Sequence, residues 1–312
     1  MLDDYQQVAA SYAGWDRLGA ETDFVAEHLT GDALVARLQD AEVVVAMRER
    51  TAVDAALLEQ LPALRLLVTT GMVNASIDVA AAAARGVTVC GTGGVPGAAA
   101  ELTWALLLAV LRRVPHSDRE LTAGRWQEDV LPGADLGGAT LGLVGLGRLG
   151  QRVARVALAF EMDVIAWSEN LDPDLARSLG VEPVASKDVL LERADAVSLH
   201  LRLSDRTRGI VGARELGLMK RSAVLVNTSR GPLVDEAALV AALRDGTIAG
   251  AGLDVYDEEP LPVDHPLRGL GNAVLTPHTG YVTTGTYRVF YEDAVEDIAA
   301  WQAGTPLRTL DS

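Results

Sequence analysis

Short apolar runs alternate with longer segments of helical periodicity along most of the chain. Between about residues 41 and 276, the apolar runs are separated by Ala- and Leu-rich segments whose apolar positions follow the period of a helix. Strands that alternate with helices in this way are typical of βαβ units built around parallel sheets. The pattern therefore predicts an α/β protein.

The first part of the chain predicts a small sheet with its own helices. We expect strands at residues 42–46, 64–70 and 87–89, and helices near residues 53–60 and 77–85. A long segment of helical periodicity, residues 98–113, follows the glycine-rich loop at residues 91–97. We expect this segment to bridge two domains.

A second unit with six expected strands follows. It opens with a strand at residues 140–144, a helix at about residues 149–161 and a strand at residues 163–167, which together make one βαβ unit. Further strands are expected at residues 196–199, 223–227, 249–254 and 273–275. Six strands fit a Rossmann sheet. The tail at residues 287–302 has helical periodicity, and we expect it to return to the first domain.

Length and charge narrow the class of function. The chain has 312 residues and 49% hydrophobic content, which is enough for two ordinary domains. Its formal net charge of −16 argues against a nucleic-acid partner, because proteins that bind phosphate backbones carry clustered Lys and Arg. An anionic substrate would be repelled at long range, so its site would need a local Arg in a cleft.

The cysteine content and the apolar runs point to a cytoplasmic protein. Cys90 is the only cysteine, so no intramolecular disulfide is possible and we expect no metal site. The start of the chain lacks the pattern of a secretory signal, and no apolar run is long enough to span a membrane. We therefore expect neither a membrane partner nor secretion.

A glycine-rich motif lies between the first strand and the first helix of the second unit. Gly145, Gly147 and Gly150 form a G-x-G-x-x-G that also contains Arg148 and Leu149. Such glycines allow a tight turn and let backbone N–H groups approach a pyrophosphate at the positive end of a helix. We assign all five residues to a dinucleotide site, where Arg148 would add a side-chain contact to phosphate.

The residues after the next strand bear on the choice between NAD and NADP. This strand is followed by Ser168, Glu169 and Asn170, about 20 residues past the glycines. Glu169 would accept hydrogen bonds from ribose hydroxyls and repel a 2′-phosphate, and the nearby loop offers no Arg to hold one. NAD is favoured, and NADP stays possible because Ser168 and Asn170 tolerate either cofactor.

Polar residues follow several other strands of the second unit. Arg230 comes shortly after one strand, Asp254 ends the next, Glu259 lies just beyond it, and His278 follows the last. In an open α/β sheet, ligands bind outside the carboxyl ends of the strands, so we expect these side chains to share one crevice. Thr228, two residues before Arg230, is assigned to the cofactor site.

These residue types suit the reduction of a 2-oxo acid. A guanidinium such as Arg230 offers two parallel donors to a carboxylate and carbonyl. Hydride addition to a carbonyl creates an alkoxide, to which the imidazole of His278 would give a proton, and from which it would take one in reverse. Glu259 would fix the imidazole tautomer and favour its charged form. Taken singly, Arg230, Glu259 and His278 are each as easily explained by a purely structural role as by a functional one. His200, at another strand end, is the second-choice histidine for the acid/base.

Five segments together resemble the D-isomer-specific 2-hydroxyacid dehydrogenase family. The similarity covers nearly the whole chain, including residues 61–64 and the helix with Glu101. The segments are Gly145-Leu-Gly-Arg-Leu-Gly150, Val197-Ser-Leu-His-Leu201, Asn227-Thr-Ser-Arg-Gly231, Asp254-Val-Tyr-Asp-Glu-Glu-Pro260 and Thr276-Pro-His-Thr-Gly280.

The resemblance implies two Rossmann-like domains with parallel sheets. A flavodoxin-like substrate domain would comprise residues 1–97 and 282–312, and an NAD-binding Rossmann domain would comprise residues 98–281. The resemblance also implies a homodimer built on the cofactor domains.

The resemblance assigns roles to individual residues as well. Arg230 would bind substrate, His278 would be the acid/base and Glu259 its partner, while Asp254 would contact the nicotinamide carboxamide. The substrate carboxylate would meet the backbone of a loop with Gly71, Met72, Val73 and Asn74, where Asn74 could add a side-chain contact. Arg48 is a further candidate for the same cleft, with a surface role equally open.

Three features depart from the family pattern. Ser168 stands where members commonly have an acidic residue, with Glu169 one position later. The chain begins at about the point where the first strand of the family ends. Arg202 replaces a usual proline, and we have no physical account of its effect.

Three functions are consistent with these residues. The favoured one is an NAD(P)-dependent reductase of a small 2-oxo acid such as glyoxylate or hydroxypyruvate. The alternatives are a formate or phosphite dehydrogenase on the same scaffold, and a nucleotide-sensing interaction protein like the C-terminal binding corepressors.

Overall fold

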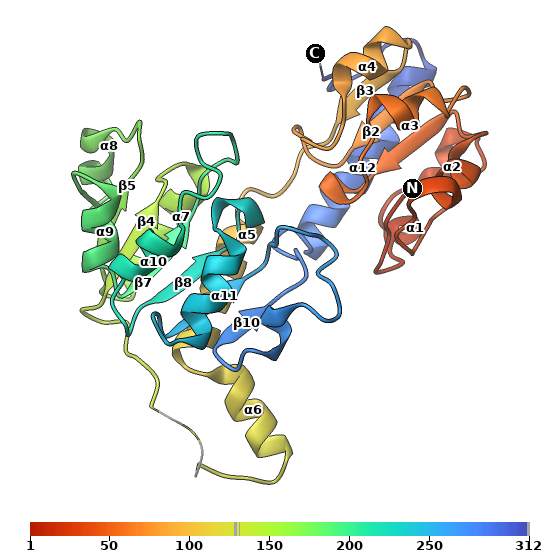
Figure 1. The fold of residues 1–312 in the computed structure, drawn as a ribbon. Helices are drawn as coiled ribbons and strands as arrows, with labels where there is room; N and C mark the ends of the chain where they lie inside the picture. Colours follow the sequence, from red (N-terminus) through yellow and green to blue (C-terminus); the bar gives the residue numbers. More distant parts are fainter. Residues whose placement is uncertain (128–129, 131, 311–312) are drawn as a thin grey trace. The chain divides into compact units, whose positions relative to one another are not determined.

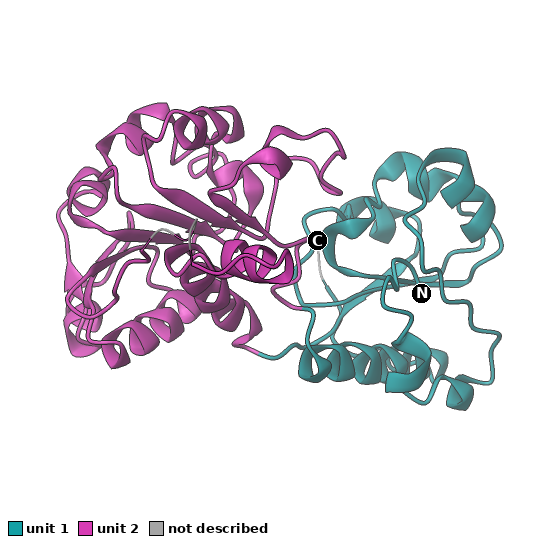
Figure 2. Ribbon diagram, turned by 90° about the horizontal axis from the view of Figure 1, so that it is seen from below, with its two compact units in different colours: residues 1–95, 282–312 teal, residues 96–281 magenta. Residues whose placement is uncertain are grey.

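The chain forms two compact units in a computed structural model that describes residues 1–127, 130 and 132–310. Unit 1 comprises Met1–Val95 and Val282–Ser312, and unit 2 comprises Pro96–Tyr281 (Figure 2). Each unit contains a parallel sheet with helices packed on it. The α/β class with parallel sheets that the sequence predicts is therefore confirmed.

Unit 1 contains a parallel sheet of three strands among its described residues, in the order β1-β2-β3 (Figure 1). Each expected strand is present, although the second is shorter at both ends than its apolar run. The strands are β1 (Val43–Ala46), β2 (Leu66–Thr69) and β3 (Thr88–Gly91). The helices of this unit are α1 (Ala9–Tyr12), α2 (Gly31–Leu38), α3 (Ala55–Glu59), α4 (Val79–Ala84) and α12 (Thr284–Gln302), with 3₁₀ turns at Trp15–Leu18 and Arg48–Arg50.

The long helix α12 returns to unit 1, as the periodicity of the tail predicts. It packs against β2 and α1, and its Tyr291 is fully buried, in ring contact with Trp15. The buried apolar residues of α2, α3 and α4 form one cluster with side chains of the three strands. Helices, strands and the loops between them thus share the core of this unit, because a three-stranded sheet offers little apolar surface of its own.

The end of the chain is held to unit 1 by Arg308. The backbone of Arg308 and of Leu310 bonds to β3, where the Gly91 amide donates to the Arg308 carbonyl at 2.9 Å and the Leu310 amide donates to the Val89 carbonyl at 2.8 Å. The guanidinium binds Asp297 at 2.9 Å, and the side chain of Asp297 has no exposed surface. Burial raises the pKa of Asp297 to about 7, although Arg308 acts to lower it.

Unit 2 contains a parallel sheet of seven strands among its described residues, in the order β10-β9-β8-β7-β4-β5-β6. Six are the expected strands, and the seventh, β6, was missed because its two residues include a proline and form no apolar run. The strands are β4 (Thr140–Val144), β5 (Asp163–Trp167), β6 (Glu182–Pro183), β7 (Ala196–Leu199), β8 (Val224–Asn227), β9 (Gly250–Leu253) and β10 (Ala273–Leu275). Read outward from β4, this is the strand order of a Rossmann sheet.

Helices cover both faces of this sheet. Helices α5 (Ala98–Leu111), α7 (Arg148–Ala159) and α8 (Pro173–Ser178) contribute to one apolar cluster, and α9 (Lys187–Arg193), α10 (Ala213–Leu218) and α11 (Glu236–Arg244) to another. Burial on both faces explains why the strands read as continuous apolar runs. The remaining elements are α6 (Val114–Thr122), which projects away from the sheet in Figure 1, and 3₁₀ turns at Gly231–Leu233 and Pro266–Gly269.

The expectation that residues 98–113 bridge two domains is wrong, because α5 lies wholly within unit 2. Leu106 and Leu107 are buried there, and α5 packs on β8, β9 and α7. A Cβ atom at Gly252 of β9 would lie 2.9 Å from the Cβ of Leu106. The apolar residues of this helix therefore belong to the core of one unit.

We predict that Arg308→Ala lowers the free energy of unfolding by about 3 kcal/mol at pH 8, because it leaves the buried Asp297 carboxylate without its cation. The loss should shrink at pH 5, where a carboxyl with a pKa of about 7 is protonated in the folded protein. Urea denaturation at the two pH values measures this. The control is Arg37→Ala, which breaks an exposed pair with Asp23 and should cost at most about 1 kcal/mol. Equal losses for both variants would contradict the prediction.

Candidate active site

The glycine loop joins β4 to α7 through two close backbone approaches. Gly145 has a φ of +103°, and a Cβ atom there would lie 2.6 Å from the His200 carbonyl oxygen. A Cβ atom at Gly150 would lie 2.3 Å from the Gly145 carbonyl oxygen, so only glycine fits either position. At Gly147, by contrast, a Cβ atom would have no neighbour within 4 Å. The open side of the turn therefore lies at its centre, where a cofactor phosphate would approach.

The start of α7 supplies donors for such a phosphate. The first helical bond runs from the Gln151 amide to the Gly147 carbonyl at 2.9 Å, so the amides of Arg148, Leu149 and Gly150 precede the helical ladder. Arg148 is exposed and Leu149 is half-buried. Backbone donors at the positive end of a helix fit the pyrophosphate of a dinucleotide.

The residues after β5 include Glu169, which contacts an arginine that the sequence analysis did not identify. Ser168 is half-buried and Glu169 is exposed, as expected for the edge of a site. Arg206, on the loop after β7, places its guanidinium 3.3 Å from the Glu169 carboxylate. The expectation that no Arg lies near Glu169 is therefore wrong, because an arginine 37 residues away in the sequence reaches it.

His200, the second-choice histidine, lies beneath the glycine loop. Its Nε2 is 3.0 Å from the Ser198 hydroxyl, and its Nδ1 is buried without a hydrogen-bond partner among the described residues. Burial lowers the pKa of His200 to about 4. At neutral pH this ring is therefore uncharged, and it supports the backbone of the loop.

Arg230 is positioned by the buried end of β8. The Asn227 side chain donates to the Arg230 carbonyl at 2.9 Å and accepts from the Ser229 amide at 3.0 Å. The Arg230 guanidinium donates to the Ser229 carbonyl at 2.7 Å. Thr228 is 9% exposed, and its hydroxyl bonds to the Thr103 hydroxyl of α5 at 2.7 Å.

Gly231 brings Arg230 close to the segment that carries Glu259. A Cβ atom at Gly231 would lie 2.0 Å from both the carbonyl carbon and the carbonyl oxygen of Tyr256. The turn after β8 and the turn after β9 therefore touch through their backbones. Any side chain at position 231 would push the two turns apart.

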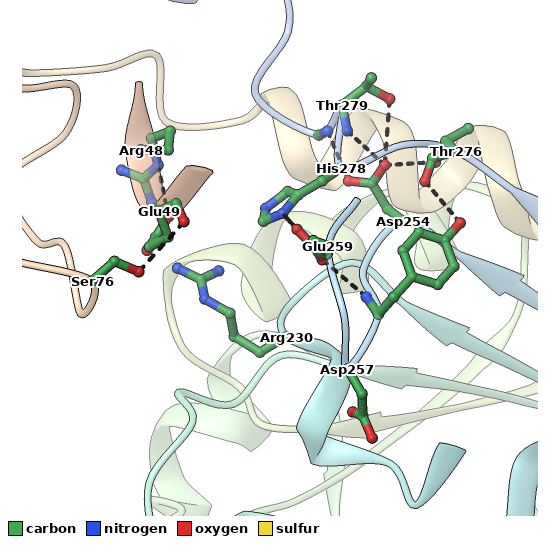
Figure 3. A network of polar contacts seen from close by, with 12 residues as sticks. Arg48, Glu49, Ser76, Arg230, Asp254, Asp257, Glu259, Thr276, His278 and Thr279 are labelled. Carbon is green, nitrogen blue, oxygen red and sulfur yellow. Dashed lines mark hydrogen bonds and ion pairs between the residues drawn. The ribbon is translucent and has the colours of Figure 1, made fainter. Parts of the chain in front are cut away.

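Glu259 and His278 form the central contact of the site (Figure 3). The Glu259 carboxylate lies 2.5 Å from Nδ1 of His278 through one oxygen, and its other oxygen accepts from the Tyr256 amide at 2.9 Å. Both side chains are partly exposed. In Figure 3, the Arg230 guanidinium and the His278 ring extend toward the same region beside Glu259. The structure thus brings together the three residues expected to carry the chemistry.

Asp254 holds the loop on which His278 lies. One carboxylate oxygen accepts from the Thr276 hydroxyl at 2.6 Å and the Thr279 amide at 2.7 Å, and the other accepts from the Gly280 amide at 2.8 Å. The residue is 1% exposed, and burial raises the pKa of Asp254 above its usual value while these bonds oppose the rise. Its hydrogen bonds bracket His278 on both sides.

His278 itself has an unusual backbone conformation. Its φ is +53°, a left-handed value that non-glycine residues rarely adopt. Such conformations persist where the surroundings enforce them, here the bonds from Asp254 to the following two residues. The Tyr281 ring contacts the imidazole edge to face at 5.7 Å between centroids. The ring is thereby directed by backbone, carboxylate and aromatic contacts together.

The expected substrate loop lies in unit 1 and is braced from within. Met72 and Val73 are exposed, whereas Asn74 is buried and its amide donates to the Arg48 carbonyl at 2.6 Å and the Thr69 hydroxyl at 2.8 Å. The side chain of Asn74 thus supports the loop. The guanidinium of Arg48 lies against Gly71, where a Cβ atom would be 1.9 Å from it.

The part of the chain that the structure describes gives little support for a metal site, a membrane-spanning helix or a reactive cysteine. It contains no group of three or more His, Cys, Asp or Glu residues that could hold a metal ion. It also contains no helix long and apolar enough to cross a membrane. Cys90 is fully buried, and burial raises the pKa of its thiol to about 11, so it is a packed core residue.

Comparisons with known proteins identify the family. A family model described as the NAD binding domain of D-isomer specific 2-hydroxyacid dehydrogenases matches residues 104–280. The glyoxylate reductase of Aeropyrum pernix is 42% identical over 260 residues, which cover 81% of this chain and 77% of that protein. The D-3-phosphoglycerate dehydrogenase of Methanocaldococcus jannaschii is 40% identical over 260 residues, which cover 83% of this chain but 49% of that protein.

The chain therefore spans about half the length of that phosphoglycerate dehydrogenase. Among solved structures, a phosphoglycerate oxidoreductase from Vibrio cholerae superposes with a TM-score of 0.92 at 37% identity, covering 97% of this chain and 98% of that one. The matched residues 104–280 contain the glycine loop, Arg230, Glu259 and His278. This chain belongs to the D-isomer-specific 2-hydroxyacid dehydrogenase family of NAD(P)-linked oxidoreductases.

Proposed function

We propose that this chain reduces a small 2-oxo acid of the glyoxylate or hydroxypyruvate kind to the D-2-hydroxy acid with NAD(P)H. The observation that carries the proposal is the Glu259–His278 hydrogen bond, on a loop that Asp254 fixes. Arg230 and the glycine loop follow strands of the same parallel sheet, so all these groups lie at the carboxyl edge where α/β proteins bind ligands.

The hydrogen bond to Glu259 decides which imidazole atom acts. Because Nδ1 of His278 faces the carboxylate at 2.5 Å, Nε2 is the atom left to meet a substrate oxygen. When bound, the nicotinamide supplies the hydride to the carbonyl carbon. Nε2 of His278 then gives its proton to the developing alkoxide, and Glu259 stabilises the charged ring before that transfer. In the oxidation direction Nε2 takes the proton back.

Arg230 binds the substrate in this proposal. Its guanidinium is a planar, permanently charged donor that can hold a carboxylate and the neighbouring carbonyl oxygen at once. The charge also polarises the carbonyl and favours the alkoxide. On a chain with a net charge of −16, such a local cation is what an anionic substrate requires.

The cofactor would occupy the carboxyl edge of the unit 2 sheet. Gly145, Gly147, Arg148, Leu149 and Gly150 would bind its pyrophosphate. We further propose Ser168 and Glu169 as contacts to the adenosine ribose, and Thr228 and Asp254 as contacts on the nicotinamide side.

Unit 1 would serve as the substrate domain. The backbone N–H groups of Met72 and Val73, two exposed residues, would bind the substrate carboxylate, on a loop that Asn74 and Arg48 brace. Gly71 adds the left-handed turn, with a φ of +92°. We also place the protein in the cytoplasm, because its single cysteine is suited to a reducing compartment.

We propose a homodimer in which α6 is part of the interface. This helix carries no buried residue, and Val114 and Leu121 on it are 53% and 59% exposed. Trp126, just beyond it, is 68% exposed. Large apolar side chains gathered on a projecting element are typical of a surface that a partner covers.

A substrate panel tests the proposed activity. We expect the protein to oxidise NADH or NADPH with glyoxylate or hydroxypyruvate, measured by the loss of absorbance of the reduced nicotinamide. NAD⁺ or NADP⁺ with formate and with phosphite completes the panel. Turnover only with formate or phosphite would replace the proposal by the corresponding dehydrogenase. Cofactor binding by a folded protein without any turnover would favour a nucleotide-sensing protein.

The dimer is tested by Leu121→Glu, which places a charge in the proposed apolar contact. We expect the wild-type protein to run at twice the monomer mass in light scattering and the variant to dissociate on dilution. The matched control is Leu175→Glu on α8, at a side chain that is 42% exposed. A wild-type monomer, or a variant as dimeric as the control, would contradict the proposed interface.

A further inference from the structure

The ion pair between Glu169 and Arg206 crosses the end of β4. Glu169 follows β5, and Arg206 lies on the loop after β7, and these two strands flank β4 in the sheet. The end of β4 carries the glycine loop. The adenosine half of a dinucleotide lies beside this position in Rossmann sheets, with its 2′ group at the end of the second strand. Both charges are therefore placed where a cofactor 2′-hydroxyl or 2′-phosphate would arrive.

The loop that carries Arg206 is ordered by its own hydrogen bonds. The Thr207 hydroxyl donates to the Arg202 carbonyl at 2.7 Å and accepts from the Ser204 amide at 2.8 Å. The Gly209 amide donates to the Pro232 carbonyl at 2.8 Å, which ties the loop to the turn after Arg230. These hydrogen bonds hold the backbone under Arg206 in a defined conformation.

The pair itself is easily broken. The side chains of Arg206 and Glu169 are 74% and 66% exposed, and their charged atoms are 3.3 Å apart. Exposed ion pairs of this kind add little to stability, so either partner can turn to a ligand at small cost. A 2′-phosphate carries about two negative charges and accepts charge-assisted bonds from a guanidinium, whereas a ribose hydroxyl donates to a carboxylate.

We propose that Arg206 is a specificity-determining residue that lets this chain bind the 2′-phosphorylated cofactor NADP(H) alongside NAD(H), with Glu169 as the opposing residue that favours NAD(H). Arg206 neutralises Glu169 and supplies the cation for the 2′-phosphate. Ser168, the first residue after β5, adds no charge beside the phosphate. The inference rests on the proposed function only for its biological use, because it concerns the binding of the adenosine end. Asp205 and Arg202 on the same loop are both exposed and offset one another in charge.

Calorimetric titration with adenosine 2′,5′-bisphosphate and with 5′-AMP tests the inference without turnover. We expect the wild-type protein to bind the bisphosphate at least as tightly as 5′-AMP, and less tightly as salt rises. Arg206→Ala should weaken bisphosphate binding about tenfold and change 5′-AMP binding less than about twofold. Glu169→Gln should strengthen bisphosphate binding about threefold or more, since a repelling charge is removed. Circular dichroism verifies that each variant is folded.

The matched control is Arg214→Ala, which removes the same charge from an exposed ion pair with Asp188 on other helices. It should leave the ratio of the two affinities unchanged. The inference is overturned if Arg206→Ala shifts that ratio no more than the control does, or if the wild-type protein binds 5′-AMP more tightly than the bisphosphate. Failure of 2-oxo acid reduction with an intact Arg206 effect would refute the proposed function alone. Reduction with NADH only, and no Arg206 effect, would refute this inference alone.

Discussion

The arrangement of the site depends on one buried carboxylate. Asp254 directly follows β9 of the unit 2 sheet, and its two oxygens accept hydrogen bonds from the hydroxyl of Thr276 and from the amides of Thr279 and Gly280. These bonds enforce the left-handed backbone of His278 and, together with the Glu259 carboxylate and the Tyr281 ring, direct its imidazole. The cost of burying the carboxylate, visible in its raised pKa, is offset by hydrogen bonds that also fix the histidine loop.

The parallel arrangement of the strands brings the residues of the site together. Their carboxyl ends meet at one edge, so residues far apart in the sequence come together without long connecting loops. Glycines then set how closely the turns approach. Gly150 lets α7 start against the backbone of Gly145, and Gly231 lets the turn of Arg230 touch that of Tyr256. The same edge therefore carries both the proposed phosphate cradle and the proposed acid/base pair.

Most of the fold could be predicted from the sequence because buried elements impose a regular pattern of apolar residues. The continuous apolar runs of the parallel strands located all of them except β6, which has no run to detect. The three residues proposed to carry the chemistry could be singled out because each follows a strand end. Apart from the Glu259–His278 pair, side-chain partners were not found, since periodicity carries no record of them. Arg206 reaches Glu169 across 37 residues, and Asn74, expected to face substrate, binds Arg48 and Thr69. Such pairs appear only once the loops are folded.

The most direct test compares wild-type protein with His278→Ala and Glu259→Gln in steady-state reduction of glyoxylate, using whichever nicotinamide cofactor the wild type prefers. If His278 is the acid, His278→Ala should lower kcat by about 10²–10⁴-fold, and Glu259→Gln should lower it by a smaller factor. Cofactor affinity, measured by titration, should stay unchanged in both variants. A His278→Ala variant that turns over within about threefold of the wild type would contradict the assignment of proton transfer to this residue.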